Sequence, residues 1–149
     1  MATRQGQVEI ALRVVECLWS ERTFPGEHLA ADCSFLLHGR AIPRAEFEHL
    51  SQHALGRAIP DASVRVRRTL HQGDAVAVRA TTSGTHTGEL FGVPATGRTV
   101  TFNCIAWFNF VGLQVRELHL QWNGFAPIRP LWDAYDRLTR DADVTGMAR

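Results

Sequence analysis

The hydrophobic pattern of this chain changes its period near the middle, and that change limits the folds it can adopt. Between Val8 and Trp19, apolar residues recur every three or four positions, which is typical of a helix with one buried face. From Val64 to Leu70, and again in three later segments, apolar and polar residues alternate. Alternation places every second side chain on one face of a strand. The sequence therefore predicts helices first and an antiparallel meander afterwards, which is an α+β fold with helices on one face of the sheet.

The expected elements follow from these patterns and from the turn residues between them. Helices are predicted at 8–19 and 43–55, strands at 33–38, 64–71, 76–81, 99–111 and 115–122, and a last helix at 127–138. Turns at Gly73 and Gly112 join the later strands into two hairpins. The last helix carries an apolar stripe that needs a partner, so we expect it to close the open end of the domain as a lid or to contact a second subunit.

Composition excludes several classes of protein. The chain has 149 residues with 16 basic and 15 acidic side chains, a balance too even to predict a nucleic-acid partner. No segment approaches the roughly 20 apolar residues of a membrane-spanning helix, so we expect no membrane partner. Cys17, Cys33 and Cys104 are odd in number and widely spaced, which predicts free thiols in a cytoplasmic protein rather than disulfides.

A glycine-rich segment between the two hairpins carries a resemblance to a known family. It contains Gly84-Thr85-His86-Thr87-Gly88, Gly92-Val93-Pro94 and Thr96-Gly97-Arg98. Together with Ile59-Pro60-Asp61, Glu117 and Trp122, this segment resembles the SnoaL-like polyketide cyclases. The resemblance implies a single domain over residues 1–149, in which a curved antiparallel sheet with helices on its concave face forms a cone around an internal cavity. It also implies a homodimer. We expect residues 1–7 and 140–149 to be flexible.

The catalytic positions of that family are not kept in this chain. The Gln-x-His pair of the aldol cyclases falls on Cys104 and Ala106, and their acidic residue falls on Leu120. The tyrosine of the related ketosteroid isomerases falls near Val14. None of these side chains can take a proton at the required place, so the resemblance implies the fold of the family without its aldol or isomerase chemistry.

Strand alternation predicts which residues face the interior. Together with Trp19 and Phe35, the expected substrate-binding residues are Val78, Cys104, Ala106, Phe108, Leu118, Leu120 and Trp122. The small side chains of Cys104 and Ala106 leave room for a small hydrophobic molecule, although the same pattern also suits a plain hydrophobic core. The opposite face is expected to hold Arg65, Arg67, Arg79, Asn103, Asn109, Glu117, His119 and Gln121. Ile105 and Trp107 also fall on that face, which favours a dimer contact there.

Few side chains are candidates for acid–base catalysis. His38 ends the first strand, and an imidazole titrates near neutral pH, so His38 is the predicted general acid or base. Asp32, just before that strand, could orient His38 or act itself. His49 and His53 lie four residues apart on a helix, but no third ligand accompanies them, so we expect no metal and no cofactor.

Three functions remain open on this evidence. The first is a cofactor-independent tailoring enzyme of the isomerase or lyase type, which closes a ring in a hydrophobic polyketide-like intermediate by holding it in a reactive conformation. The second is an epoxide hydrolase or epoxide-opening cyclase, which would need a second acid beside Asp32. The third is a non-catalytic module that binds a small molecule or dimerises.

Overall fold

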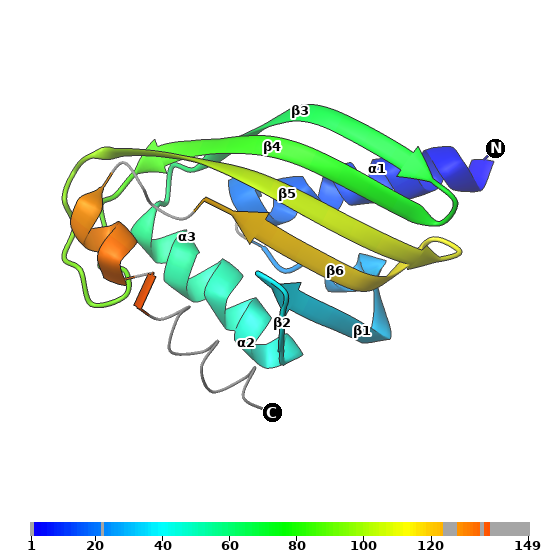
Figure 1. Cartoon of the computed structure of the whole chain (residues 1–149), viewed down its shortest axis with the longest axis horizontal. Coiled ribbons are helices and arrows are strands. Elements are labelled where there is room, and N and C mark those ends of the chain that lie inside the picture. The colour runs from blue at the N-terminus through cyan, green and yellow to red at the C-terminus, as the bar shows by residue number, and fades with distance from the viewer. Residues whose placement is uncertain (1, 22, 124–127, 135, 138–149) are drawn as a thin grey trace.

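The structure is a computed structural model that describes residues 2–21, 23–123, 128–134 and 136–137. Its helical elements are α1 (Ala2–Glu16), η1 (Cys17–Glu21), η2 (Gly26–His28), α2 (Arg44–His49), η3 (Leu50–Ala54) and α3 (Leu55–Ala58). Its strands are β1 (Leu29–Leu37), β2 (Arg40–Ile42), β3 (Ser63–Gln72), β4 (Ala75–Thr85), β5 (Thr99–Val111) and β6 (Gln114–Trp122). The predicted α+β class, with a curved sheet and helices, is confirmed (Figure 1).

The sheet is mixed rather than purely antiparallel. Its strand order is β2-β1-β6-β5-β4-β3, and β1 runs parallel to β6. Both predicted hairpins are present, β3 with β4 and β5 with β6. Parallel neighbours need a long crossover connection, and here helices α2 and α3, the β3–β4 hairpin and strand β5 are among the elements that separate β1 from β6 in the chain. Alternation assigns faces to a strand but not its neighbour, so the sequence pattern could not give this pairing.

Helix α1 begins earlier than its apolar pattern indicates. Residues 2–7 were predicted to be flexible, but they form the first turns of α1. Gln7 is buried, and its side chain bonds to Asp74 and His71 and to the carbonyl oxygen of Gly112. These contacts are distant in sequence, so no local signal predicts them. Residues 140–149 lie outside the described residues.

The first strand is longer than predicted and turns back into a strand that the sequence analysis missed. His38 and Gly39 both have positive φ, 52° and 79°, and Leu37 pairs with Arg40 across them. Two successive residues with positive φ are typical of a type I′ turn between antiparallel strands. Strand β2 has three residues, too few for alternation to be recognised.

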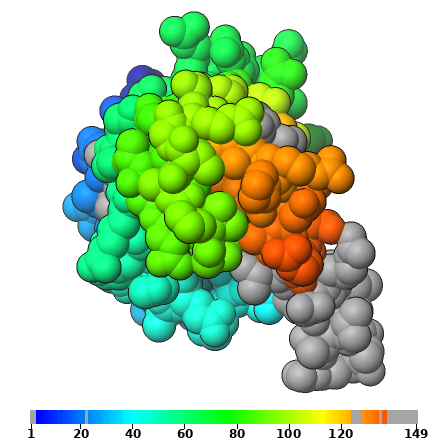
Figure 2. All heavy atoms as spheres, turned by 90° about the vertical axis from the view of Figure 1, so that its left-hand side faces the viewer, coloured from blue at the N-terminus to red at the C-terminus, as the bar shows by residue number. Residues whose placement is uncertain are grey.

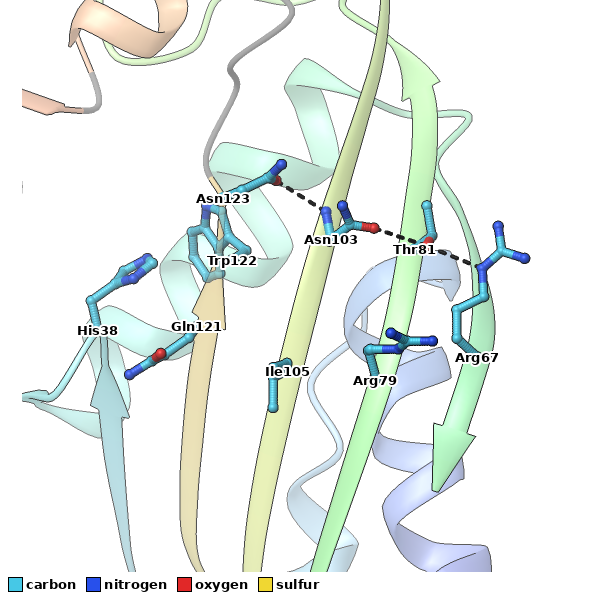
Figure 3. Close-up of a pocket in the computed structure, with 9 residues that line it drawn as sticks. All are labelled: His38, Arg67, Arg79, Thr81, Asn103, Ile105, Gln121, Trp122 and Asn123. Carbon is cyan, nitrogen blue, oxygen red and sulfur yellow. Dashed lines mark hydrogen bonds between the residues drawn. The ribbon is translucent and has the colours of Figure 1, made fainter. Parts of the chain in front are cut away.

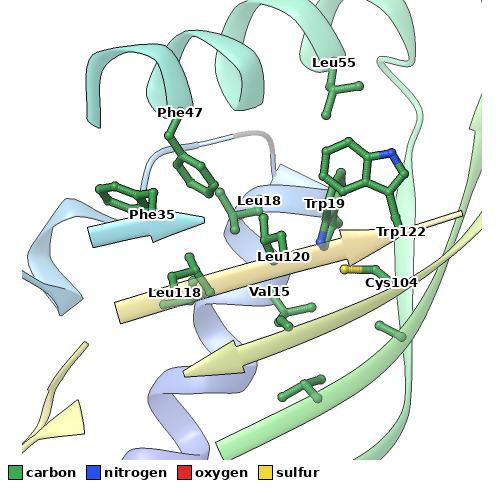
Figure 4. Packing of buried hydrophobic residues seen from close by; sticks show 14 of the residues in the cluster. Val15, Leu18, Trp19, Phe35, Phe47, Leu55, Cys104, Leu118, Leu120 and Trp122 are labelled. Carbon is green, nitrogen blue, oxygen red and sulfur yellow. The ribbon is translucent and has the colours of Figure 1, made fainter. Parts of the chain in front are cut away.

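One hydrophobic cluster joins the helices to the inner face of the sheet. Val15, Leu18 and Trp19 reach it from α1 and η1, and Phe47 and Leu55 reach it from α2 and α3 (Figure 4). The expected C-terminal helix is present at 129–134 and 136–137, and Ile128 and Leu131 belong to the same cluster with no exposed surface. This segment lies beside the loop between β4 and β5 at one end of the domain (Figure 2). Among the described helices, none is both long and apolar enough to cross a membrane.

Candidate functional site

The structure brings all nine predicted substrate-binding residues into that cluster. Trp19, Phe35, Val78, Cys104, Ala106, Phe108, Leu118, Leu120 and Trp122 are each at most 7% exposed. Strand pairing sets Val78, Ala106 and Leu120 in one row across the inner face, and Cys104 beside Trp122. A role in binding stays a prediction, because the same contacts also make a hydrophobic core.

The ring of Trp19 lies over the small residues of the inner face. It packs edge-on against Phe102 and Trp122, with ring centroids 5.3 and 5.4 Å apart, and its nitrogen points toward the sulfur of Cys104 (Figure 4). The space that Cys104 was expected to leave for a ligand therefore adjoins an indole ring from the protein itself. A ligand at this place would have to displace side chains.

Two buried donors of this interior, Trp19 Nε1 and Thr82 Oγ1, have no oxygen or nitrogen acceptor in the part of the chain that the structure describes. Trp19 Nε1 has the sulfur of Cys104, a weak acceptor, beside it. Buried polar groups are normally paired, so such atoms need an explanation. Burial raises the pKa of Cys104 to about 12, while contact with Trp19 lowers it. The thiol is therefore protonated at neutral pH and is neither a base nor a thiolate nucleophile. The sequence analysis missed Thr82.

His86 is a buried neutral imidazole that organises the glycine-rich loop. The backbone N–H of Thr96 donates to its Nδ1 at 3.3 Å, and the Thr96 hydroxyl oxygen lies 3.0 Å from the same nitrogen. Since Nδ1 is the acceptor, the buried Nε2 carries the proton. Burial lowers the pKa of His86, while a weak hydrogen bond with the backbone of Gly88 raises it. These contacts give His86 a structural role in the loop.

The two predicted catalytic residues lie apart on β1 and the turn that follows it. His38 is half-buried, its backbone N–H donates to the carbonyl of Leu120, and its ring packs edge-on against Trp122 at 5.0 Å between centroids. Asp32 is exposed and forms a salt bridge of 3.2 Å with Arg116. Six residues of extended chain span roughly 20 Å. The structure thus gives no support for Asp32 orienting His38, and the exposed Asp32 carboxylate lies at the surface rather than in the interior where paired acids would open an epoxide.

A groove of about 740 Å³ lies on the outer face of the sheet, beside His38 (Figure 3). It is lined by His38, Arg67, Arg79, Thr81, Asn103, Ile105, Gln121, Trp122 and Asn123. Arg67 Nε donates to the hydroxyl of Thr81, and that hydroxyl donates to Asn103 Oδ1, both at 3.1 Å. The backbone N–H of Asn103 donates to Asn123 Oδ1 at 3.0 Å. From the sequence this face is predicted to contact a second subunit, and no groove is predicted there. The signal for the groove is the arginines Arg65, Arg67 and Arg79 on two neighbouring strands.

The histidines of the second predicted helix give no support for a metal site. His49 and His53 are exposed, with ring centroids 5.3 Å apart. Among the described residues, no three histidine, cysteine or acidic side chains gather in a group that could hold a metal ion.

Comparison with known proteins identifies the family. A family model described as SnoaL-like polyketide cyclase matches residues 9–131, and the chain belongs to this family. The fold and the family membership support a role in cyclisation or another tailoring reaction. No curated protein matches the chain.

Solved structures of similar proteins share this fold. AclR, a proposed hydroxylase from Streptomyces galilaeus, has a TM-score of 0.73 and 26% identity, over 80% of this chain and 90% of AclR. A proposed SnoaL-like polyketide cyclase from Jannaschia sp. CCS1 has a TM-score of 0.70 and 23% identity, over 83% and 89% of the two chains. IdmH, a proposed polyketide cyclase from Streptomyces antibioticus, has a TM-score of 0.59 and 23% identity, over 82% and 90%.

Proposed function

We propose that this protein is a cytoplasmic, cofactor-independent enzyme that closes a ring in a hydrophobic polyketide-like intermediate bound on the inner face of the sheet. The observation that carries the proposal is the buried Trp19 N–H, which points toward the weakly accepting sulfur of Cys104 and has no oxygen or nitrogen acceptor among the described residues. A substrate carbonyl oxygen would satisfy it. The three cysteines are free thiols, as expected in a reducing compartment.

The chemistry follows from the groups that this interior contains. Trp19 Nε1–H and the Thr82 hydroxyl donate to a carbonyl of the substrate and draw electron density from the conjugated carbons next to it. The apolar walls hold the chain folded so that its two ends meet, and one carbon–carbon bond forms at the expense of π bonds. The product is an isomer of the substrate, so no atom enters or leaves. One donor in a dry site lowers a barrier of this kind by about 2.7–4 kcal/mol.

His38 is the residue we propose for proton transfer. Its ring lies against Trp122, which belongs both to the inner cluster and to the lining of the outer groove. A histidine with positive φ is uncommon, and strained residues of this kind cluster at functional sites. His38 would serve cyclisations in which a proton must move between carbons after the ring has closed.

Substrate entry requires part of the inner cluster to move. Ile128 and Leu131 are buried in it and belong to the segment 128–134, which lies beside the β4–β5 loop at one end of the domain (Figure 2). We propose that this segment acts as a lid. Its few turns join the cluster by a small number of side chains, and short packed segments open at a lower free energy than a central sheet does.

The proposal is tested by incubating the purified chain, without added cofactor, with a panel of linear polyene and polyketone intermediates. Liquid chromatography with mass spectrometry should find a product of unchanged mass and altered retention. Trp19→Phe keeps a ring but removes the N–H, so it should lower kcat by about 100-fold with little change in KM. Leu18→Met, a neighbouring core change, is the matched control. Full activity of Trp19→Phe, with the control also active, would refute the donor role.

A second candidate is supported by the dense packing of the inner face. The interior is filled at all times if the side chains of Trp19, Leu120 and Trp122 do not move. In that case the protein is a binding or dimerisation module that has the fold of the family without its catalytic activity. Xenon pressurised into crystals separates the two. Xenon bound beside Trp19 would favour the enzyme, whereas an interior that excludes it, with no isomer formed from the panel, would favour the module.

We also propose a homodimer formed through the part of the outer face that lies nearer to the β3–β4 turn than the groove does. Strand pairing sets Leu70, Ala77 and Trp107 in one row, and Leu70 and Trp107 are 59% and 45% exposed. Exposed apolar groups gathered in this way are typical of interfaces. Light scattering of the wild type should give twice the mass of one chain, and Trp107→Glu should give the single mass. A monomeric wild type would refute the proposal.

A further inference from the structure

Four arginines lie close together on the strands at one edge of the sheet. Arg65, Arg67 and Arg68 are on β3, and Arg79 is on β4. Strand pairing sets Arg68 directly opposite Arg79, and Arg65 opposite Thr81 farther along the same two strands. Like charges directly opposite each other destabilise a sheet. Within the described part of the chain, no ion pair involves any of the four. A charge arrangement that costs stability, with no carboxylate to offset it, indicates a ligand that supplies the missing negative charge.

The outer groove adjoins these arginines and matches an anion in its donors. Arg67 and Arg79 line it, and none of its nine lining residues carries a carboxylate. The bond from Arg67 Nε to Thr81 fixes the plane of that guanidinium, so its two terminal nitrogens remain to bind an anionic group in a bidentate manner. The acid of this face on β6, Glu117, is already bonded to Asn109 and His119.

The groove also has an apolar part. Ile105 and Trp122 line it next to the polar side chains (Figure 3), and Ile105 lies in the same row as Arg79. Its volume of about 740 Å³ is within the range of small-molecule sites, about 300–1,000 Å³. An inorganic ion alone would leave this apolar surface uncovered.

We propose that the outer groove binds an organic anion, a carboxylate or phosphate ester attached to an apolar body. The guanidinium groups of Arg67 and Arg79 bind the anionic group, and the apolar body lies against Ile105 and Trp122. This site is on the opposite face of the sheet from the Trp19 N–H. It shares His38 and Trp122 with the proposed enzyme, but Arg67 and Arg79 belong to the groove and not to the inner face, so substituting them tests anion binding separately from ring closure.

Octyl phosphate and octanoate are suitable probes, with octanol as the neutral control, added to the full-length chain. Binding is measured by isothermal titration calorimetry, and the Nε–Hε signals of the arginines are followed by NMR. Either anion should bind, shift the signals of Arg67 and Arg79, and bind more weakly as salt is raised. Octanol should shift neither signal. Arg79→Gln should weaken anion binding at least about tenfold, whereas Arg40→Gln, an exposed arginine on β2, should not change it.

Two further results decide the inference. Arg79→Gln should unfold at a higher temperature than the wild type when no anion is present, because it removes the charge facing Arg68. Unshifted arginine signals with both anions, or equal binding by Arg79→Gln and wild type, would overturn the proposal. A dimer in which the second copy covers the groove would also overturn the proposal. In that case the NMR signal of Arg79 would change when the protein is diluted but not when octyl phosphate is added.

Discussion

The side chain of Gln7 should contribute more to the free energy of unfolding than its position near the start of the chain indicates. It is 1% exposed and makes three long-range hydrogen bonds. Its Nε2 donates to Asp74 Oδ1 at 3.0 Å and to the carbonyl oxygen of Gly112 at 2.9 Å, and its Oε1 lies 2.9 Å from His71 Nε2. The reverse amide orientation would point an oxygen at two acceptors, so this network fixes the orientation and requires His71 to donate.

These bonds tie α1 to the turns of both hairpins, so their loss can be given a magnitude. A bond to a charged group contributes about 1.5–3 kcal/mol and a neutral one about 0.5–1.5 kcal/mol. Asp74 is exposed, and water replaces part of its bond in the variant. We therefore expect Gln7→Ala to lower the free energy of unfolding by about 3 kcal/mol, which corresponds to about 6–12 °C in Tm for a chain of this size.

Urea denaturation followed by circular dichroism measures this change. Gln5→Ala is the matched control, since Gln5 is exposed and bonds only along the helix to Glu9, and it should change stability by less than about 0.5 kcal/mol. Gln7→Glu keeps the size but points an acceptor at Asp74 and Gly112, so it should destabilise at least as much as Gln7→Ala. Equal stability of Gln7→Ala and the control would refute the reasoning.

Three further predictions concern the loop and the core. Burial lowers the pKa of His86 from its usual 6.5. At a pH below about 6.5 the unfolded chain therefore binds a proton at this residue that the folded chain does not bind, so the free energy of unfolding should fall as the pH decreases. His86→Gln should remove that part of the slope in pH-dependent denaturation, and an unchanged slope would contradict it. A side chain at Gly88 would overlap the backbone oxygen of Arg57, so Gly88→Ala should lower the free energy of unfolding by about 2–3 kcal/mol. Gly92→Ala should lower it by about 1 kcal/mol, because φ is +80° there but the space is open. Equal losses for the two variants in urea denaturation would contradict this prediction. Burial raises the pKa of Cys104 to about 12, so its thiol should not react with iodoacetamide in the native protein near pH 8 but should react after unfolding. Peptide mass spectrometry measures this labelling. Rapid labelling of the native thiol would contradict the prediction, because it would mean that the interior opens readily.

The proposed enzyme depends on donors in a dry interior rather than on an acid–base pair. Cys104 stays protonated, His86 is neutral and held by Thr96, and Asp32 is bonded to Arg116 at the surface. These side chains are compatible with ring closure in which the interior holds the substrate folded and a donor polarises one carbonyl. His38 is the candidate that remains for a proton transfer, at the margin between the inner cluster and the outer groove.

Local pattern in the sequence determined much of this protein. The change from helical spacing to alternation gave the element types, and it separated the inner residues from Arg65, Arg79 and Ile105 on the outer face, because burial repeats with the period of the backbone. The loop residues from Gly84 to Arg98 gave the family. These inferences need only a few neighbouring residues at a time.

Tertiary structure alone decided the contacts between distant segments. The parallel pairing of β1 with β6, the anchoring of Gln7 by two turns, and the position of Trp19 over Cys104 each join residues dozens of positions apart. Residue spacing carries no record of such contacts, since they depend on how whole elements pack. The outer groove is of the same kind, because Arg67, Thr81 and Asn103 come from three strands whose register brings them side by side.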